Sequence, residues 1–162
     1  RELADAARDS MAELNLKIYD SVKTMEDIEH IVRLNEMRGG DDIVFIDFIQ
    51  NIRKYNCRSK YEETSQIAID TQNLAKDCRT CIVCLSQLNL GQMESDELIF
   101  KGAGELGEAA DIGIQLKKNR SDPTCKKQIK VVVKKNRHGA IGEWKMVYEN
   151  NWTRIAELDD KA

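Results

Sequence analysis

The chain has 162 residues, a length that favours one folded domain with a single hydrophobic core. Hydrophobic residues make up 41% of the chain and charged residues 33%, and no apolar run approaches the length of a membrane span, so composition argues against a membrane protein. The sequence shows no signal peptide, and we therefore expect a cytoplasmic protein with no membrane partner.

The net charge of -3 conceals an uneven distribution of charge along the chain. Residues 1–50 carry twelve acidic side chains against six basic ones, whereas residues 117–137 carry nine Lys or Arg against the single Asp122. A basic segment of this kind is a candidate contact for the phosphates of a nucleic acid or a nucleotide. A solvated lysine face is the alternative interpretation.

The first third of the chain predicts helices and strands joined by short loops. We expect a helix over residues 2–14, which begins without a capping residue, and a short strand over 16–19. Thr24 is a good N-cap with the acidic Asp27 three positions on, and the apolar spacing that follows predicts a helix ending at Gly39 and Gly40. The order helix, strand, helix, strand indicates an α/β fold with a parallel sheet.

The apolar run at residues 43–46 predicts a strand buried on both faces, as in parallel sheets covered by helices. Asp47 follows it directly and is expected at the carboxyl edge of the sheet, where open α/β sheets bind ligands. In P-loop nucleoside triphosphatases an aspartate at this place holds Mg²⁺, usually through water. An Asp that only caps the next turn is the alternative.

A second strand of the same kind is predicted at residues 81–85. The polar loop at 51–60 is long enough to reach a partner, and the helix predicted over 61–78 connects it to this strand. Gln87 follows the strand, so we expect it beside Asp47 at the same sheet edge. A glutamine there can donate to a γ-phosphate oxygen and accept from a water, although it can also simply cap a loop.

The five cysteines include a C-x2-C-x2-C run at Cys78, Cys81 and Cys84. Residues three apart in a strand point to opposite faces, so Cys81 and Cys84 cannot converge on one metal ion. We interpret these cysteines as small hydrophobic residues that pack in the core.

The last third of the chain begins with a glycine-rich segment and continues as strands. Its three glycines, at positions 102, 104 and 107, expose backbone N–H groups that can approach a phosphate chain, with Lys101 supplying charge, although a flexible loop at a helix start is equally compatible. We expect strands over 111–116, 128–133, 143–148 and 152–155, and a hairpin over 134–142.

Four motifs, in this order and at these spacings, resemble the RecA-like motor domain of DnaB-type replicative DNA helicases. They are DFIQ at 47–50, LSQL at 85–88, the glycine-rich segment at 101–111 and KNRHG at 135–139. WTRI at 152–155 is also similar to the final strand of that family. The resemblance implies an incomplete RecA-like P-loop NTPase core: one α/β domain over residues 1–162, with a mainly parallel sheet flanked by helices and a C-terminal antiparallel hairpin.

The resemblance also implies a set of nucleotide-binding residues. Asp47 matches the Walker B aspartate that holds Mg²⁺, and Gln87 matches the glutamine that contacts the γ-phosphate of ATP. Lys135 and Arg137 match the pair that reaches the nucleotide of the neighbouring subunit in a homohexamer. Arg137 takes the place of the arginine finger, which stabilises charge on the transferring phosphoryl group.

For DNA, the resemblance implies that Lys101, Gly102 and Gly104 belong to the loop that holds single-stranded DNA in the central channel of the ring. Lys101 replaces an arginine of the family and Gly102 replaces a glutamate. Lysine keeps the charge of arginine but not its bidentate contact with phosphate.

One family element is missing from these residues. No G-x-x-x-x-G-K-[ST] motif occurs among them, so the Walker A loop and the general-base glutamate that follows it in the family are absent. We therefore expect a fragment of a longer motor that is inactive alone.

The predicted function is that of an ATP-dependent replicative helicase that steps 5′ to 3′ along single-stranded DNA and unwinds the duplex. ATP and Mg²⁺ are the expected cofactors, and a primase and a helicase loader are candidate partners. Two alternatives stay open: a RecA-type recombinase or clock-type ATPase, and a non-catalytic remnant that only binds the helicase ring or DNA.

Overall fold

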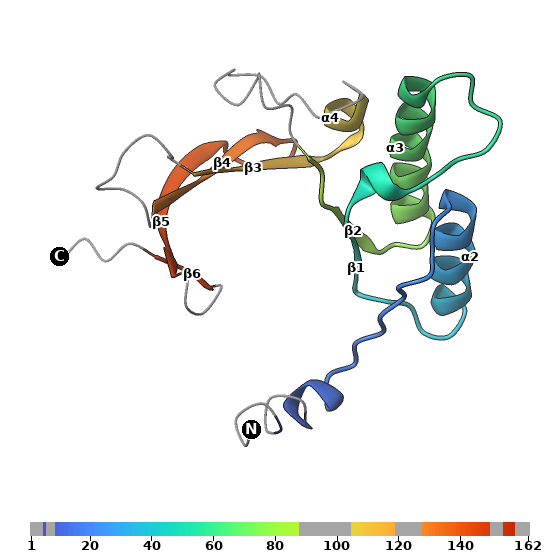
Figure 1. Cartoon of the computed structure of the whole chain (residues 1–162), viewed down its shortest axis with the longest axis horizontal. Coiled ribbons are helices and arrows are strands. Elements are labelled where there is room, and N and C mark those ends of the chain that lie inside the picture. Colours follow the sequence, from blue (N-terminus) through green and yellow to red (C-terminus); the bar gives the residue numbers. More distant parts are fainter. Residues whose placement is uncertain (1–4, 6–8, 88–104, 119–127, 150–153, 158–162) are drawn as a thin grey trace.

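A computed structural model describes residues 5, 9–87, 105–118, 128–149 and 154–157, and the fold is given for these residues. The described strands form two separate sheets, and Figure 1 shows how the helices lie relative to them. The elements, in chain order, are α2 (Met25–Glu36), β1 (Ile43–Ile46), the 3-10 helix η1 (Ile49–Asn51), α3 (Lys60–Asp77), β2 (Cys81–Cys84), α4 (Glu105–Ala109), β3 (Ile112–Lys118), β4 (Gln128–Asn136), β5 (Gly142–Glu149) and β6 (Arg154–Glu157).

The first sheet is the parallel pair of β1 and β2. Ile43 is opposite Cys81 and Ile46 is opposite Cys84, without a break in the register. The connection between the two strands contains α3, which is the helical crossover that a parallel pair requires. Both helices α2 and α3 lie on one side of this pair (Figure 1).

The second sheet contains four strands in the order β3-β4-β5-β6, and each neighbouring pair is antiparallel. The hairpin between β4 and β5 is the one predicted from the sequence, with its turn at residues 137–141. Most of the described strands are therefore paired in antiparallel fashion, whereas the order of helices and strands in the first third of the chain predicted a parallel sheet.

The start and the end of α2 follow local sequence signals. The Thr24 hydroxyl accepts a hydrogen bond from the Asp27 backbone N–H at 3.1 Å, as the predicted N-cap requires. At the other end, Gly39 and Gly40 have φ angles of 117° and 82°, a region that favours glycine, and the Gly40 N–H donates to the Asn35 carbonyl at 2.9 Å. The predicted start of this helix is thus confirmed, and the helix ends at Glu36, shortly before the predicted glycine pair.

A single core joins the helices to the parallel pair. Its members are aliphatic or small side chains, at most 9% exposed: Met25, Ile28, Val32, Ile46, Ile49, Ile52, Ile67, Ala68, Leu74, Cys78 and Leu106. Leu106 is the contribution of the short helix α4, which is thereby fixed to the same core. Among the described residues, no helix is both long and apolar enough to cross a bilayer.

The prediction that β1 and β2 are buried on both faces is wrong for the described residues. Ile46 is 6% exposed, but Phe45 is 66% exposed and Val83, its partner across the strands, is 38% exposed. Successive residues of a strand point to opposite faces, and the helices cover only one face of this pair. A run of four apolar residues reports the character of a strand but not how many of its faces are covered.

Two further predictions need correction or fall partly outside the described residues. Residues 16–19 form no strand, and their apolar side chains are more than half exposed because no neighbouring strand pairs with them among the described residues. For the helix predicted at 2–14, residues 5 and 9–12 are helical, and positions 1–4 and 6–8 lie outside the described residues.

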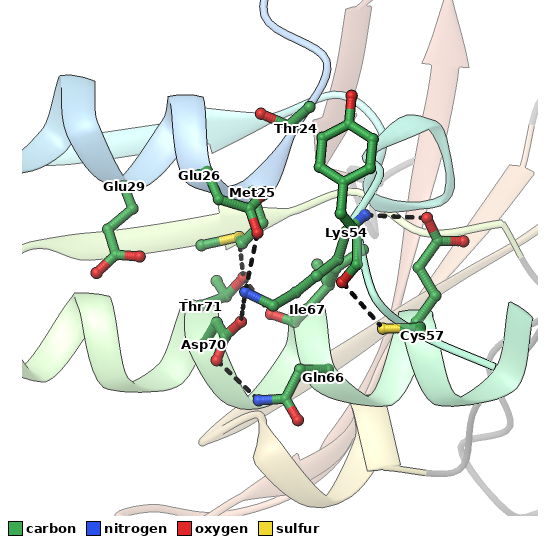
Figure 2. Close-up of polar contacts among 12 residues, drawn as sticks. Thr24, Met25, Glu26, Glu29, Lys54, Cys57, Gln66, Ile67, Asp70 and Thr71 are labelled. Carbon is green, nitrogen blue, oxygen red and sulfur yellow. Dashed lines mark hydrogen bonds and ion pairs between the residues drawn. The ribbon is translucent and has the colours of Figure 1, made fainter. Parts of the chain in front are cut away.

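Lys54 connects the loop after η1 to both long helices (Figure 2). Its Nζ atom lies 2.7 Å from the Asp70 carboxylate of α3 and 3.2 Å from the Glu26 carboxylate of α2. The hydrogen bond to Asp70 raises the pKa of Lys54, partial burial opposes this, and Glu26 adds to the increase. One cation therefore fixes the path of the chain between η1 and α3.

Glu63 of α3 holds the same loop from the other side. Its carboxylate accepts hydrogen bonds from the Lys54 backbone N–H at 2.9 Å and from Lys60 Nζ at 2.7 Å, and its side chain is only 12% exposed. Burial by itself raises the pKa of this carboxyl group, but the two donors outweigh burial and the pKa is lowered overall.

We expect the contacts of Glu63 to make the free energy of unfolding depend on pH. Because the folded-state pKa of Glu63 lies below the unfolded value of about 4.3, its ionised form stabilises the fold above that pH, and the contribution is lost as the pH falls through the folded-state pKa. Urea unfolding at pH values from about 6 to about 3 should show a decline that is smaller for Glu63→Gln by on the order of 1 kcal/mol. Glu36→Gln, a change at an exposed carboxylate of α2, is the control, and equal declines for wild type and Glu63→Gln would contradict the assignment.

Candidate nucleotide-binding site

The chain leaves β1 and β2 at the same edge of the parallel pair. Beyond the register that ends with Ile46 and Cys84, the Leu85 N–H donates to the Ile46 carbonyl at 3.0 Å, and the Ile49 N–H donates to the Leu85 carbonyl at 2.9 Å. Asp47 and Gln87 therefore follow their strands at one carboxyl edge, which is the ligand-binding edge of open α/β sheets.

Asp47 offers a carboxylate that the described structure does not use. The residue is exposed, and its side chain makes no hydrogen bond or ion pair with any described residue. Mg²⁺ commonly binds one or two carboxylates, keeps several waters and takes its other ligands from phosphates. A single open carboxylate fits that mode, and the described residues contain no cluster of three or more acidic, His or Cys side chains that would form an all-protein metal site.

Gln50 links the two strand exits, a role that the sequence did not indicate. Its Nε2 donates to Ser86 Oγ at 2.7 Å and makes a longer contact of 3.4 Å with the Gln87 carbonyl. Its Oε1 accepts from the Gln87 backbone N–H at 3.3 Å. The carboxamide thus holds both backbone polar groups of Gln87, whose exposed position leaves its side chain accessible at the edge.

Lys135 and Arg137 lie on the second sheet, at the end of β4 and just after it. Their hydrogen bonds go to the end of α4 and to Asp111 rather than to Asp47 or Gln87. The structure therefore brings together the two residues of the first sheet and, separately, the two cations of the second.

Three predicted site residues, Lys101, Gly102 and Gly104, lie outside the described residues, and so does part of the basic segment at 117–137. The described chain resumes with α4, which lies within the glycine-rich segment at 101–111.

The cysteines behave only partly as predicted. Cys78 is buried in the core and Cys84 packs against it, and burial raises the pKa of the Cys84 thiol to about 11. Cys81 is exposed, so its prediction as a core residue is wrong. It points to the open face of β2, opposite the face that carries Cys84, and this agrees with the prediction that the two cannot share a metal ion.

A parallel pair of strands joined by a helical crossover, with polar side chains at its carboxyl edge, is typical of the class of α/β folds that bind ligands at that edge. Comparison with known families gives the membership within that class. Residues 1–157 match the model of the DnaB-like helicase C-terminal domain, and the chain belongs to this family.

Two relatives of this chain are replicative DNA helicases by name. A probable plasmid replicative DNA helicase of Chlamydia muridarum (strain MoPn / Nigg) is 29% identical over 122 residues, which are 70% of this chain and 26% of that protein. The replicative DNA helicase DnaB of Leifsonia xyli subsp. xyli (strain CTCB07) is 25% identical over 163 residues, 94% of this chain and 36% of that protein. The chain thus spans about a quarter to a third of the length of these relatives.

Solved structures confirm the fold class. A DnaB-like replicative helicase, described with its interactions with primase, superposes with a TM-score of 0.83 at 21% identity, over 96% of this chain and 40% of that one. The ATPase domain of G40P gives 0.82 at 23% identity, over 96% of this chain and 59% of that one. The RecA-like fold expected from the motifs is therefore shown, and the roles of the individual residues stay predictions.

The link through Gln50 can be tested by hydrogen exchange. Replacing Gln50 with Ala removes the acceptor of the Gln87 N–H, so we expect faster exchange of that amide and a loss of about 1 kcal/mol in the free energy of unfolding. Gln66→Ala, which removes a comparable carboxamide contact with Asp70 on α3, is the matched control. Unchanged exchange of the Gln87 amide in Gln50→Ala would show that Gln50 does not hold the strand exit.

Proposed function

We propose that these residues are the greater part of an ATP-driven motor of a replicative DNA helicase. In this proposal Asp47 holds Mg²⁺ through water and Gln87 contacts the γ-phosphate of ATP. The observation that carries the proposal is the parallel register of β1 and β2, which puts an open carboxylate and an accessible glutamine at one sheet edge. When bound, Mg²⁺ supplies charge neutralisation on the phosphates.

The proposed motor also needs a phosphate-binding loop, and residues 1–162 contain no such motif. We propose that this single α/β domain works within a longer chain that supplies it. The match to about a quarter to a third of the length of its relatives supports this view.

Assembly as a homohexamer gives the cations of the second sheet a role. The Arg137 side chain is 43% exposed at a hairpin tip, a suitable place for a group that acts on the nucleotide of a neighbouring subunit, with Lys135 beside it. Lys101, Gly102 and Gly104 are proposed to contact single-stranded DNA in the central channel as the ring translocates and unwinds the duplex.

Partners and location follow from the same proposal. One solved relative is known with its interactions with primase, and we propose a primase and a helicase loader as partners here. A replicative helicase works on DNA in the cytoplasm. The family match favours a helicase over a recombinase or clock-type ATPase, and a binding-only remnant is the outcome if a chain with a phosphate-binding loop fails to hydrolyse ATP.

Arg137 provides the sharpest test of the proposed function. In a complete chain with a phosphate-binding loop, Arg137→Ala should lower DNA-stimulated ATP hydrolysis by on the order of 10³-fold, because the developing charge on the phosphoryl group loses its stabilisation. Arg38→Ala, at an exposed arginine just after α2, is the control and should keep wild-type activity. Residues 1–162 alone should show no hydrolysis.

Mixed rings test whether Arg137 acts across subunits. Arg137→Ala and Asp47→Asn subunits should each be nearly inactive alone, but their mixture should regain hydrolysis wherever an intact Asp47 faces an intact Arg137. Wild-type activity of Arg137→Ala, or a mixture as inactive as its components, would contradict the proposed role.

A further inference from the structure

We propose that Asp111 is a positioning residue for Arg137, and that together with the end of α4 it fixes the guanidinium before the guanidinium meets a nucleotide. The proposal rests on the proposed function, because it assumes that Arg137 acts on a phosphoryl group. Asp111 ends the glycine-rich segment at 101–111, but the resemblance gives it no role and no contact with Arg137.

The pairing of β3 with β4 brings the two residues together. Ile112 is opposite Asn136, so Asp111 and Arg137 are the next residues outward on the two strands. The Arg137 N–H donates to the Asp111 carbonyl at 3.0 Å and continues the ladder by one bond. One Arg137 side-chain nitrogen, Nη1, also donates to Asp111 Oδ1 at 3.0 Å.

The end of α4 provides the second contact. Arg137 Nη2 donates to the Glu108 carbonyl at 2.9 Å, and Lys135 Nζ donates to the Gly107 and Glu108 carbonyls, each at 2.8 Å. The last carbonyls of a helix lack partners within the helix and carry partial negative charge, so they are suitable acceptors for cations. Lys135 and Arg137 therefore both bind to the carbonyl groups at the end of α4.

Helix α4 is itself held in place by the core and by α3. Leu106 of α4 is 9% exposed in the core, and the Ala109 carbonyl accepts a hydrogen bond from Gln72 Nε2 of α3 at 2.6 Å. The position of the Arg137 guanidinium is thus set by the core through a five-residue helix rather than by the hairpin alone.

Exposure indicates positioning rather than stability as the main effect of Asp111. The Arg137 and Asp111 side chains are 43% and 52% exposed, and ion pairs at this exposure contribute little to stability. A guanidinium carries five N–H donors, of which these contacts occupy two, so the remaining donors can face a phosphate. Fixing a flexible side chain near its working geometry favours catalysis, and small misplacements are costly in rate.

The test measures ATP hydrolysis by the complete helicase with Asp111→Ala. We expect kcat to fall by on the order of tenfold with the KM for ATP changed less than about twofold, because the finger acts in the transition state. Asp111→Asn keeps the shape and one oxygen acceptor, so its loss should be smaller, about threefold. In an Arg137→Lys background, which lacks the guanidinium, Asp111→Ala should lower kcat by less than about twofold.

Glu143→Ala is the matched control. It removes an ion pair of similar exposure on the same sheet, between Glu143 and Lys130 at 2.6 Å, with side chains 46% and 47% exposed. Its kcat should equal that of the wild type, and thermal unfolding of each variant shows whether it is folded.

Two results would overturn the proposal while the proposed function stands. One is wild-type kcat for both Asp111→Ala and Asp111→Asn when Arg137→Ala is inactive. The other is an equal fold-loss from Asp111→Ala in the wild-type and Arg137→Lys backgrounds. Full activity of Arg137→Ala would instead remove the part of the proposed function on which this inference rests, the action of Arg137 on the nucleotide.

Discussion

The candidate site depends on the parallel register between β1 and β2. Ile46 faces Cys84 across the strands, and two hydrogen bonds beyond the strand ends carry the pairing to Leu85 and Ile49. A slip of one residue would turn Ile46 away from the core, so burial of the helix-facing side selects one register. The same register decides that Asp47 and the chain leading to Gln87 leave the sheet at one edge.

The residues of the proposed chemistry lie at two separate places in the structure. The first is the edge of the parallel pair, where Gln50 holds the backbone of Gln87 and the Asp47 carboxylate stays open. The second is the end of α4, which holds Lys135 and Arg137. Both places are next to the core, through Ile49 and Leu106 respectively. One set of packed side chains therefore positions groups that are proposed to act on two different nucleotides of a ring.

Local signals in the sequence predicted much of this fold, and long-range contacts account for what they missed. The cap at Thr24, the glycine pair after α2 and the apolar runs of β1 and β2 are properties of a few neighbouring residues, and they led to the right elements. The exposure of Phe45 and the contacts of Gln50 and Asp111 depend on parts of the chain that are distant in sequence. The same holds for residues 16–19, which pair with no strand among the described residues. Such contacts leave no periodic pattern in a single sequence.

The most direct measurement is a structure of the complete helicase with Mg²⁺ and a non-hydrolysable ATP analogue. Our account predicts Mg²⁺ within reach of the Asp47 carboxylate through one water and the Gln87 amide at the terminal phosphate. It also predicts the Arg137 guanidinium of the adjoining subunit on the other side of that phosphate. A nucleotide bound away from the edge formed by β1 and β2 would contradict the account.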